Sequence, residues 1–248
     1  MIEIEEKNEL ENIIKEYSSA FDHNKKDTAV ILAAGHGKRI KSQTSKMLHK
    51  IWGIPTVERV YSACRTGLEN SNIILVVGIK AIDVMKVIGK RDDAIFAYQE
   101  EQNGTGHAVK IGLNPIDQNN YDGDVYVLAG DMGLIDAETI AMFKREFKSS
   151  SCDMMVLTGL YEGDPKNNNY GRIIRVKETD VNGNSAGEDK RKVVEIMEHK
   201  DILNLPEDEP YRVNFNGKEY SYTKDELIEN NEFNSGVYAF NYKYLNKF

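Results

Sequence analysis

Cysteine is scarce in this 248-residue chain, which contains only Cys64 and Cys152. Two cysteines are too few for a disulfide framework or a cysteine-based zinc cluster, so a reduced, cytoplasmic protein is the simplest prediction. No apolar run reaches the roughly 18 residues that a membrane-spanning helix needs. The first residues, MIEIEEKNELENIIKEY, also lack the basic start and cleavage site of a secretory signal. We therefore expect a soluble protein with no membrane partner.

An excess of positive charge is also missing. The 32 Lys and Arg residues are outnumbered by 40 Asp and Glu residues, which gives a formal charge of -8. This balance argues against a protein that coats nucleic acid by bulk electrostatics, so any phosphate ligand must be held locally. With 40% hydrophobic and 29% charged residues the chain can bury a sizeable core. The composition excludes disordered, collagen-like and coiled-coil proteins.

Four short, nearly continuous apolar runs indicate strands. Such runs are typical of strands that are buried on both faces, as in a parallel sheet. Segments with helical periodicity lie between them, one after Pro55 and one after a possible N-cap at Asp136. The alternation predicts an α/β fold with a Rossmann-like, doubly wound, mostly parallel sheet. The four runs occupy residues 28–34, 72–78, 125–130 and 154–159.

The two ends of the chain have sequence patterns that differ from these four apolar runs. Residues 1–26 predict an amphipathic helical extension, with Leu10, Ile13, Ile14, Tyr17 and Phe21 at helical spacing. Residues 27–248 are interpreted as one domain, with an exposed loop at 178–190. In its second half, Asn216-Gly217 predicts a hairpin, and Thr223 with Glu226 has capping-box spacing. This half is expected to add antiparallel strands on the substrate side of the core.

A glycine-rich turn, Gly35-His36-Gly37-Lys38-Arg39, follows the first core strand. Ligands of open α/β sheets bind at such carboxyl ends, and glycines let backbone N–H groups approach phosphate oxygens. A Walker loop would need Ser or Thr where Arg39 stands, and the dinucleotide fingerprint would need a small residue at Ile40. Both motifs fail at these positions, so a dinucleotide-dependent oxidoreductase is disfavoured.

Six separated blocks occur in an order and spacing that resemble the sugar-1-phosphate nucleotidyltransferases. The likeness covers about residues 28–240, and it is strongest to the uridylyltransferase domain of bacterial-type N-acetylglucosamine-1-phosphate uridylyltransferases. GTGHAV and EHKD point to that branch. The blocks are LAAGHGKRIKSQTSKMLHKIWGIP (32–55), QEEQNGTGHAV (99–109), LAGDMGL (128–134), YGRIIR (170–175), EIMEHKD (195–201) and FNSGVY (233–238).

The resemblance implies a site for each part of the substrates. It implies that one stretch of backbone lies beside the nucleotide, namely Leu32, Ala33, Ala34 and Gly35. Arg39 and Lys46 would hold the phosphates, and Asp131 would hold Mg²⁺ as the cofactor. The uracil would be read by Gln99, Gly104 and Thr105. The sugar would be bound by Gly171, Glu198 and Asn234.

The implied reaction is transfer of UMP from UTP to N-acetylglucosamine 1-phosphate, which forms UDP-N-acetylglucosamine for cell-envelope polysaccharide and releases pyrophosphate. Lys38, Ile40, Ser45 and Gly133 depart from the family pattern. The family also carries a further stretch, with a second metal-binding residue, beyond the point where this chain stops at Phe248. We therefore expect a domain truncated at its C-terminal end. Two alternatives stay open: a related pyrophosphorylase for another sugar or nucleotide, and a catalytically impaired UDP-sugar-binding regulatory domain.

Overall fold

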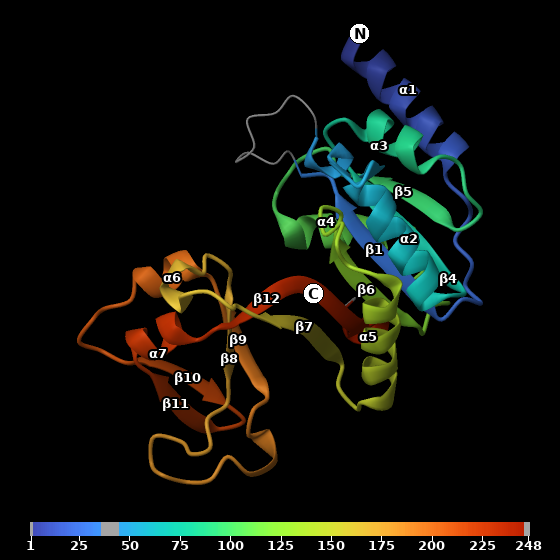
Figure 1. Ribbon diagram of the computed structural model, residues 1–248. Coiled ribbons are helices and arrows are strands. Elements are labelled where there is room, and N and C mark those ends of the chain that lie inside the picture. The colour runs from blue at the N-terminus through green and yellow to red at the C-terminus, as the bar shows by residue number, and fades with distance from the viewer. Residues whose placement is uncertain (1, 36–44, 246–248) are drawn as a thin grey trace. The chain divides into compact units, whose positions relative to one another are not determined.

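The computed structural model of the chain describes residues 2–35 and 45–245 (Figure 1). Its contacts divide the chain into two compact units. Unit 1 consists of Met1–Met155 and Gly236–Phe248, and unit 2 consists of Val156–Ser235. The chain therefore leaves unit 1 in one strand and returns to it in another.

Among the described residues of unit 1, five strands form a sheet in the order β5-β4-β1-β6-β12. The first four are parallel, and the end of β12 pairs antiparallel with β6. Every residue of β4 is buried, as expected for a strand covered on both faces. The strands are β1 (Asp27–Ala33), β4 (Ser71–Val77), β5 (Ala94–Tyr98), β6 (Asp124–Ala129) and β12 (Glu232–Asn241). The parallel core predicted from the first three apolar runs is confirmed.

Helices cover both faces of this sheet (Figure 1). Helix α4 (Thr105–Leu113) packs on β1, β4 and β5, and its Ala108 joins a buried cluster with Val30 and Ile74. On the other face, α2 (Thr56–Leu68) packs on β1 and β4 and against α5 (Ala137–Ser149). Because strand side chains alternate between faces, one strand supplies both cores. The doubly wound prediction is confirmed.

Short elements and the N-terminal helix complete unit 1. Helix α1 ends at Tyr17, so the expectation that Phe21 belongs to it is wrong. Ser19 N–H donates to Ala94 O at 2.8 Å, and Ser18 Oγ accepts from Phe96 N–H at 3.0 Å. These bonds to β5 compete with a further helical turn. The elements are α1 (Ile2–Tyr17), η1 (Lys46–Leu48), β2 (Lys50–Ile51), β3 (Ile54–Pro55), α3 (Ala81–Ile88) and α8 (Tyr242–Leu245).

Unit 2 is built on antiparallel strands, with β8 between β9 and the first half of β12. Strand β7 also pairs with β12, but both of its ends are exposed and its middle residues are only partly buried. The prediction that residues 154–159 form a strand buried on both faces is therefore wrong, because an apolar run alone does not fix which faces are covered. The strands are β7 (Met154–Leu160), β8 (Arg172–Arg175), β9 (Val193–Met197), β10 (Tyr211–Phe215) and β11 (Lys218–Tyr222).

A second buried cluster holds the hairpin β10–β11 and the two helices of unit 2 together. Tyr220 of β11, Ile202 of α6 and Leu227 of α7 belong to it. Asn216 and Gly217 have φ of 48° and 77°, so the predicted hairpin turn is confirmed, as is the capping box of α7. The remaining elements are α6 (His199–Leu203), α7 (Lys224–Glu229), η2 (Pro165–Asn167) and η3 (Gly187–Asp189). In the described part of the chain, no helix has the length and apolar character that membrane crossing requires.

Gly67 permits the close packing of α2 on α5. A Cβ at this position would lie 2.6 Å from Ala137 O and 2.8 Å from Ile140 Cβ, closer than real Cβ contacts allow. We expect Gly67→Ala to lower the free energy of unfolding by about 1–3 kcal/mol, because overpacking outweighs the gain in helix propensity. Urea unfolding measures this change.

The matched control is Gly106 of α4, where nothing lies within 4 Å of an added Cβ. Gly106→Ala should therefore not destabilise the protein. An equal decrease of the free energy of unfolding in both variants would contradict the packing argument.

Candidate functional site

The order of the strands in unit 1 creates a natural binding position. The chain runs from β1 to β4 and β5 on one side, and β6 then lies on the other side of β1. At such a reversal the connections leave in opposite directions, which opens a crevice at the carboxyl ends of the two strands. Ala34 and Gly35 follow β1, and Gly130 and Asp131 follow β6. Gly130 N–H donates to Leu32 O at 2.9 Å, so the two strand ends remain joined.

A cavity of about 270 Å³ lies at this position. It is bounded by the ends of β1 and β6, by the start of α4 and by the segment that follows β5. Seven of its lining residues are predicted site residues: Leu32, Ala34, Gly35, Lys46, Gln99, Gly104 and Thr105. Ala33, the remaining residue predicted beside the nucleotide, is buried in β1. The structure thus brings together predicted residues from both ends of the range 32–105.

The segment between β5 and α4 is fixed by two glutamine side chains. Gln99 is buried, and its Nε2 lies 3.0 Å from His107 Nδ1. Gln102 Nε2 donates to Ala34 O at 2.6 Å and so connects this segment to the end of β1. Gly104, which precedes α4, has a φ of +93°, a left-handed conformation that glycine adopts without strain. Two glutamine side chains and one left-handed glycine therefore shape this wall of the cavity.

Lys46 and Asp131 meet at the edge of the cavity. Lys46 Nζ lies 2.6 Å from Asp131 Oδ2, and the two side chains are 27% and 36% exposed. A Cβ at Gly35 would lie 3.5 Å from Lys46 Cε, so this lysine also reaches the end of β1. Thr56 Oγ1 donates to Lys46 O at 3.1 Å and to Met47 O at 3.0 Å, which anchors the turn that carries the lysine. A cation and a carboxylate thus stand together where a phosphate chain would need both.

The fit of Mg²⁺ can be judged from the donor set. Asp131 offers a partly exposed carboxylate, and Mg²⁺ prefers oxygen ligands while keeping several waters or substrate oxygens. Among the described residues, no group of three or more His, Cys, Asp or Glu could hold a metal ion by itself. The residues present therefore fit a cation that is held by one carboxylate together with substrate phosphates. Arg39, the other predicted phosphate ligand, lies outside the described residues.

The three residues predicted for the sugar lie together in unit 2. Arg172 pairs with Phe233 of β12 and with Met197 of β9, so the next position of each ladder brings Gly171 opposite Asn234 and Glu198. Asn234 N–H donates to Gly171 O at 2.9 Å. A Cβ at Gly171 would lie 3.2 Å from Glu198 Oε1, so glycine leaves room for the carboxylate. We name Gly171, Glu198 and Asn234 the sugar row.

Several cavity residues were not predicted from the sequence. They are Met47, Gln102, Ala108 and Ala129. Gln102 lies in the block QEEQNGTGHAV, but the sequence offers no signal that separates it from Gln99. Met47 is buried beside Lys46, as an ordinary core methionine would be. Only their places in the fold identify them as cavity residues.

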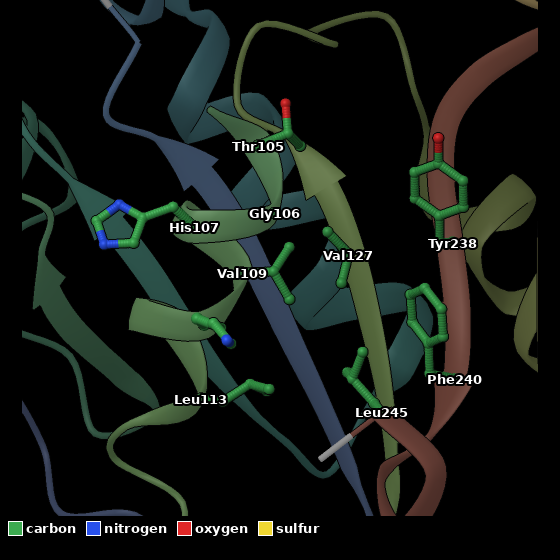
Figure 2. A pocket seen from close by; sticks show the side chains of 10 residues that line it. Thr105, Gly106, His107, Val109, Leu113, Val127, Tyr238, Phe240 and Leu245 are labelled. Atoms are coloured by element: carbon green, nitrogen blue, oxygen red, sulfur yellow. The ribbon is translucent and has the colours of Figure 1, made fainter. Parts of the chain in front are cut away.

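A larger cavity of about 580 Å³ adjoins the start of α4 and is mainly apolar (Figure 2). Val109 and Leu113 of α4 line it with Val127 of β6 and Phe240 of β12. Thr105 lines both cavities. In Figure 2 the His107 ring points away from the other labelled side chains, which agrees with its contact to Gln99. Neither Lys46 nor Asp131 is among the described residues that line this cavity, so its chemistry differs from that of the smaller one.

Comparisons with known proteins identify relatives of this chain. A family model described as the MobA-like NTP transferase domain matches residues 29–167. The bifunctional protein GlmU of Caldicellulosiruptor saccharolyticus is 36% identical over 205 residues, which cover 83% of this chain and 40% of that protein. The GlmU protein of Acetivibrio thermocellus is 35% identical over 220 residues, covering 88% and 38%. The chain thus spans about two fifths of these relatives.

A solved structure supports the fold. A protein from Bacillus anthracis, assigned as a glucose-1-phosphate thymidylyltransferase, superimposes with a TM-score of 0.62 at 18% identity, over 89% of this chain and 73% of that one. At this identity the likeness concerns the fold alone. Together with the sequence relatives it confirms the predicted resemblance to nucleotidyltransferases and the predicted mixed α/β fold.

Proposed function

This chain belongs to the family of MobA-like NTP transferase domains, and we propose that it transfers UMP from UTP to N-acetylglucosamine 1-phosphate. The products are UDP-N-acetylglucosamine and pyrophosphate. The observation that carries the proposal is the meeting of a cation, a carboxylate and a cavity at the reversal point of the sheet. The sequence relatives named GlmU favour this branch of the family.

In this proposal the cavity of unit 1 holds the nucleoside. The main chain of Leu32–Gly35 lies beside it, while Gln99, Gly104 and Thr105 contact the uracil. Gln99 is suited to this role because its buried carboxamide is already oriented by His107. A base that left buried polar groups unpaired would bind more weakly, which gives selectivity among nucleotides.

Lys46 and Arg39 hold the triphosphate in this proposal, and Asp131 holds Mg²⁺. The ion supplies charge stabilisation on the phosphate oxygens when it is bound. Lys46 places one positive charge at the edge of the cavity. A bound phosphate would replace Asp131 as the anionic partner of this lysine. Charge stabilisation and positioning account for most of the catalysis of such transfers.

The sugar row binds N-acetylglucosamine 1-phosphate. The Glu198 carboxylate accepts hydrogen bonds from sugar hydroxyl or amide groups, and Gly171 leaves room for that carboxylate. A phosphate oxygen of the sugar attacks the α-phosphorus of UTP, forming one P–O bond as the bond to pyrophosphate breaks. The sugar phosphate is anionic near neutral pH, so the chain need not supply a general base for this step.

Glu198→Ala tests the assignment of the sugar row. We expect the KM for N-acetylglucosamine 1-phosphate to rise about 10-fold or more, because loss of a hydrogen bond to a charged group costs about 1.5–3 kcal/mol. The KM for UTP should change less. Initial rates of pyrophosphate release measure both constants. Asp201→Ala, an exposed neighbour in α6, is the matched control and should leave both KM values unchanged. If the KM for UTP rose more than the KM for N-acetylglucosamine 1-phosphate, the assignment of Glu198 to the sugar site would be wrong.

A further inference from the structure

Arg172 is the first residue of β8 and is 0% exposed. An arginine remains charged in proteins, and removing a charge from water carries a large free-energy penalty. Burial lowers the pKa of the Arg172 guanidinium, and no neighbouring carboxylate contributes an opposing shift. A buried charge that lacks an acidic partner among the described residues is a poor device for stability alone. The hydrogen bonds of the guanidinium indicate another role.

The guanidinium is bound by main-chain carbonyls of a single loop. Nη1 donates to Tyr170 O at 2.5 Å, and Nη2 donates to Asn168 O at 2.7 Å and to Pro165 O at 3.0 Å. Nε has no hydrogen-bond partner within the described structure. The planar fork of arginine suits this task, because its donors diverge in fixed directions. One side chain therefore sets the path of residues 165–170.

That loop leads directly into the sugar row. Tyr170, whose carbonyl Arg172 binds, immediately precedes Gly171, and the Tyr170 ring stacks on Phe233 with centroids 4.8 Å apart. Phe233 in turn precedes Asn234, and Met197, the other register partner of Arg172, precedes Glu198. Arg172 is thus adjacent to Gly171 in the chain, and its two register partners are adjacent to Asn234 and Glu198. Strand side chains alternate, so its side chain leaves β8 on the face opposite that of position 171.

We infer that Arg172 is a positioning residue for sugar-phosphate recognition, which acts by holding the 165–170 loop and hence the main chain of Gly171 in place. This inference rests on the proposed function of the sugar row. The side chain does not touch the substrate in this account. It holds the Gly171 main chain opposite Glu198, so that the carboxylate keeps its position beside this glycine.

Two substitutions separate the contributions of charge and shape. Arg172→Lys keeps the charge but loses the planar fork, and Arg172→Met removes both while retaining a long apolar stem. We expect Arg172→Met to raise the KM for N-acetylglucosamine 1-phosphate about 10-fold and Arg172→Lys to raise it by less, with the KM for UTP within about twofold of wild type in both.

Arg175→Met is the matched control. Arg175 lies on the same strand and forms an ion pair with Glu232, which holds the pKa of that carboxyl below its usual value. Its ratio of the two KM values should remain that of wild type.

Hydrogen exchange tests the loop contact without any turnover. The amides of Asn167, Asn168 and Tyr170 have described acceptors inside or beside the loop. In Arg172→Lys and Arg172→Met these amides should exchange faster than in wild type, while those of β1 and β6 remain as slow, which also shows that unit 1 is folded. If wild type exchanges identically to both variants, the inference is overturned. If exchange rises but both KM values change equally, Arg172 is structural only. An inactive wild type with faster loop exchange in the variants would count against the proposed function, and the link to sugar recognition would fall with it.

Discussion

Replacement of Asp131 by alanine is expected to abolish the response of activity to Mg²⁺ and to lower kcat/KM about 10³-fold. The magnitude follows because the charge stabilisation that a bound metal supplies is worth several kcal/mol, and each 1.4 kcal/mol is about tenfold in rate. Asp131 is the residue that the strand order places at the end of β6, beside the cavity, with its carboxylate partly exposed. Initial rates measured over a Mg²⁺ titration check this expectation.

The control for Asp131 is Asp136, which lies five residues further along the chain. Asp136 Oδ1 accepts from Thr139 N–H at 2.8 Å and caps α5. Asp136→Ala should therefore destabilise the start of α5 and leave kcat/KM and the metal response unchanged. A normal metal titration for Asp131→Ala would remove this residue from the site.

Lys46→Ala carries the second large expected effect. We expect kcat/KM to fall about 10²- to 10³-fold, the cost of removing one group that stabilises developing charge. A second consequence has the opposite sign. Lys46 Nζ lies 2.6 Å from Asp131 Oδ2, so removal of this positive charge should tighten the binding of Mg²⁺ to the protein without substrates. Calorimetric titration with Mg²⁺ measures that change.

Lys50→Ala provides the comparison for Lys46. Lys50 is an exposed residue of β2 four positions later, and it does not line the cavity. Its removal changes the net charge equally, so a general electrostatic effect would be the same in both variants. The assignment of Lys46 is contradicted if the two variants have equal kcat/KM or if metal binding weakens in Lys46→Ala.

The sheet of unit 1 could be predicted from the sequence because its signals are local. Continuous apolar runs in β1, β4 and β6 indicate strands buried on both faces, and an aspartate at position 136 indicates a helix start. The same reasoning failed for β7, where a similar run is only partly buried. It failed for Phe21 because the helix ends where Ser18 Oγ accepts from Phe96 N–H and Ser19 N–H donates to Ala94 O. Such distant partners leave no local signal in the sequence.

The geometry of the candidate site could not be predicted in the same way. Lys46 and Asp131 are 85 residues apart, and their contact depends on which strands are neighbours. The sugar row depends on the registers of two ladders, and Arg172 has the same residue type as the ion-paired Arg175 on its own strand. Residue types and motif order indicated only candidate positions. Only the fold supplies the distances from which their chemistry can be argued.

The most direct test of the central claim is the initial rate of pyrophosphate release by the purified chain with UTP, Mg²⁺ and N-acetylglucosamine 1-phosphate. Glucose 1-phosphate in place of the sugar, and CTP, ATP or GTP in place of UTP, provide the comparisons. The account predicts saturable release that requires both substrates and the metal and that is fastest with the first pair. Preference for another pair would assign the chain to a related pyrophosphorylase. Saturable UTP binding without release under any combination would contradict the claim that this chain is the catalyst.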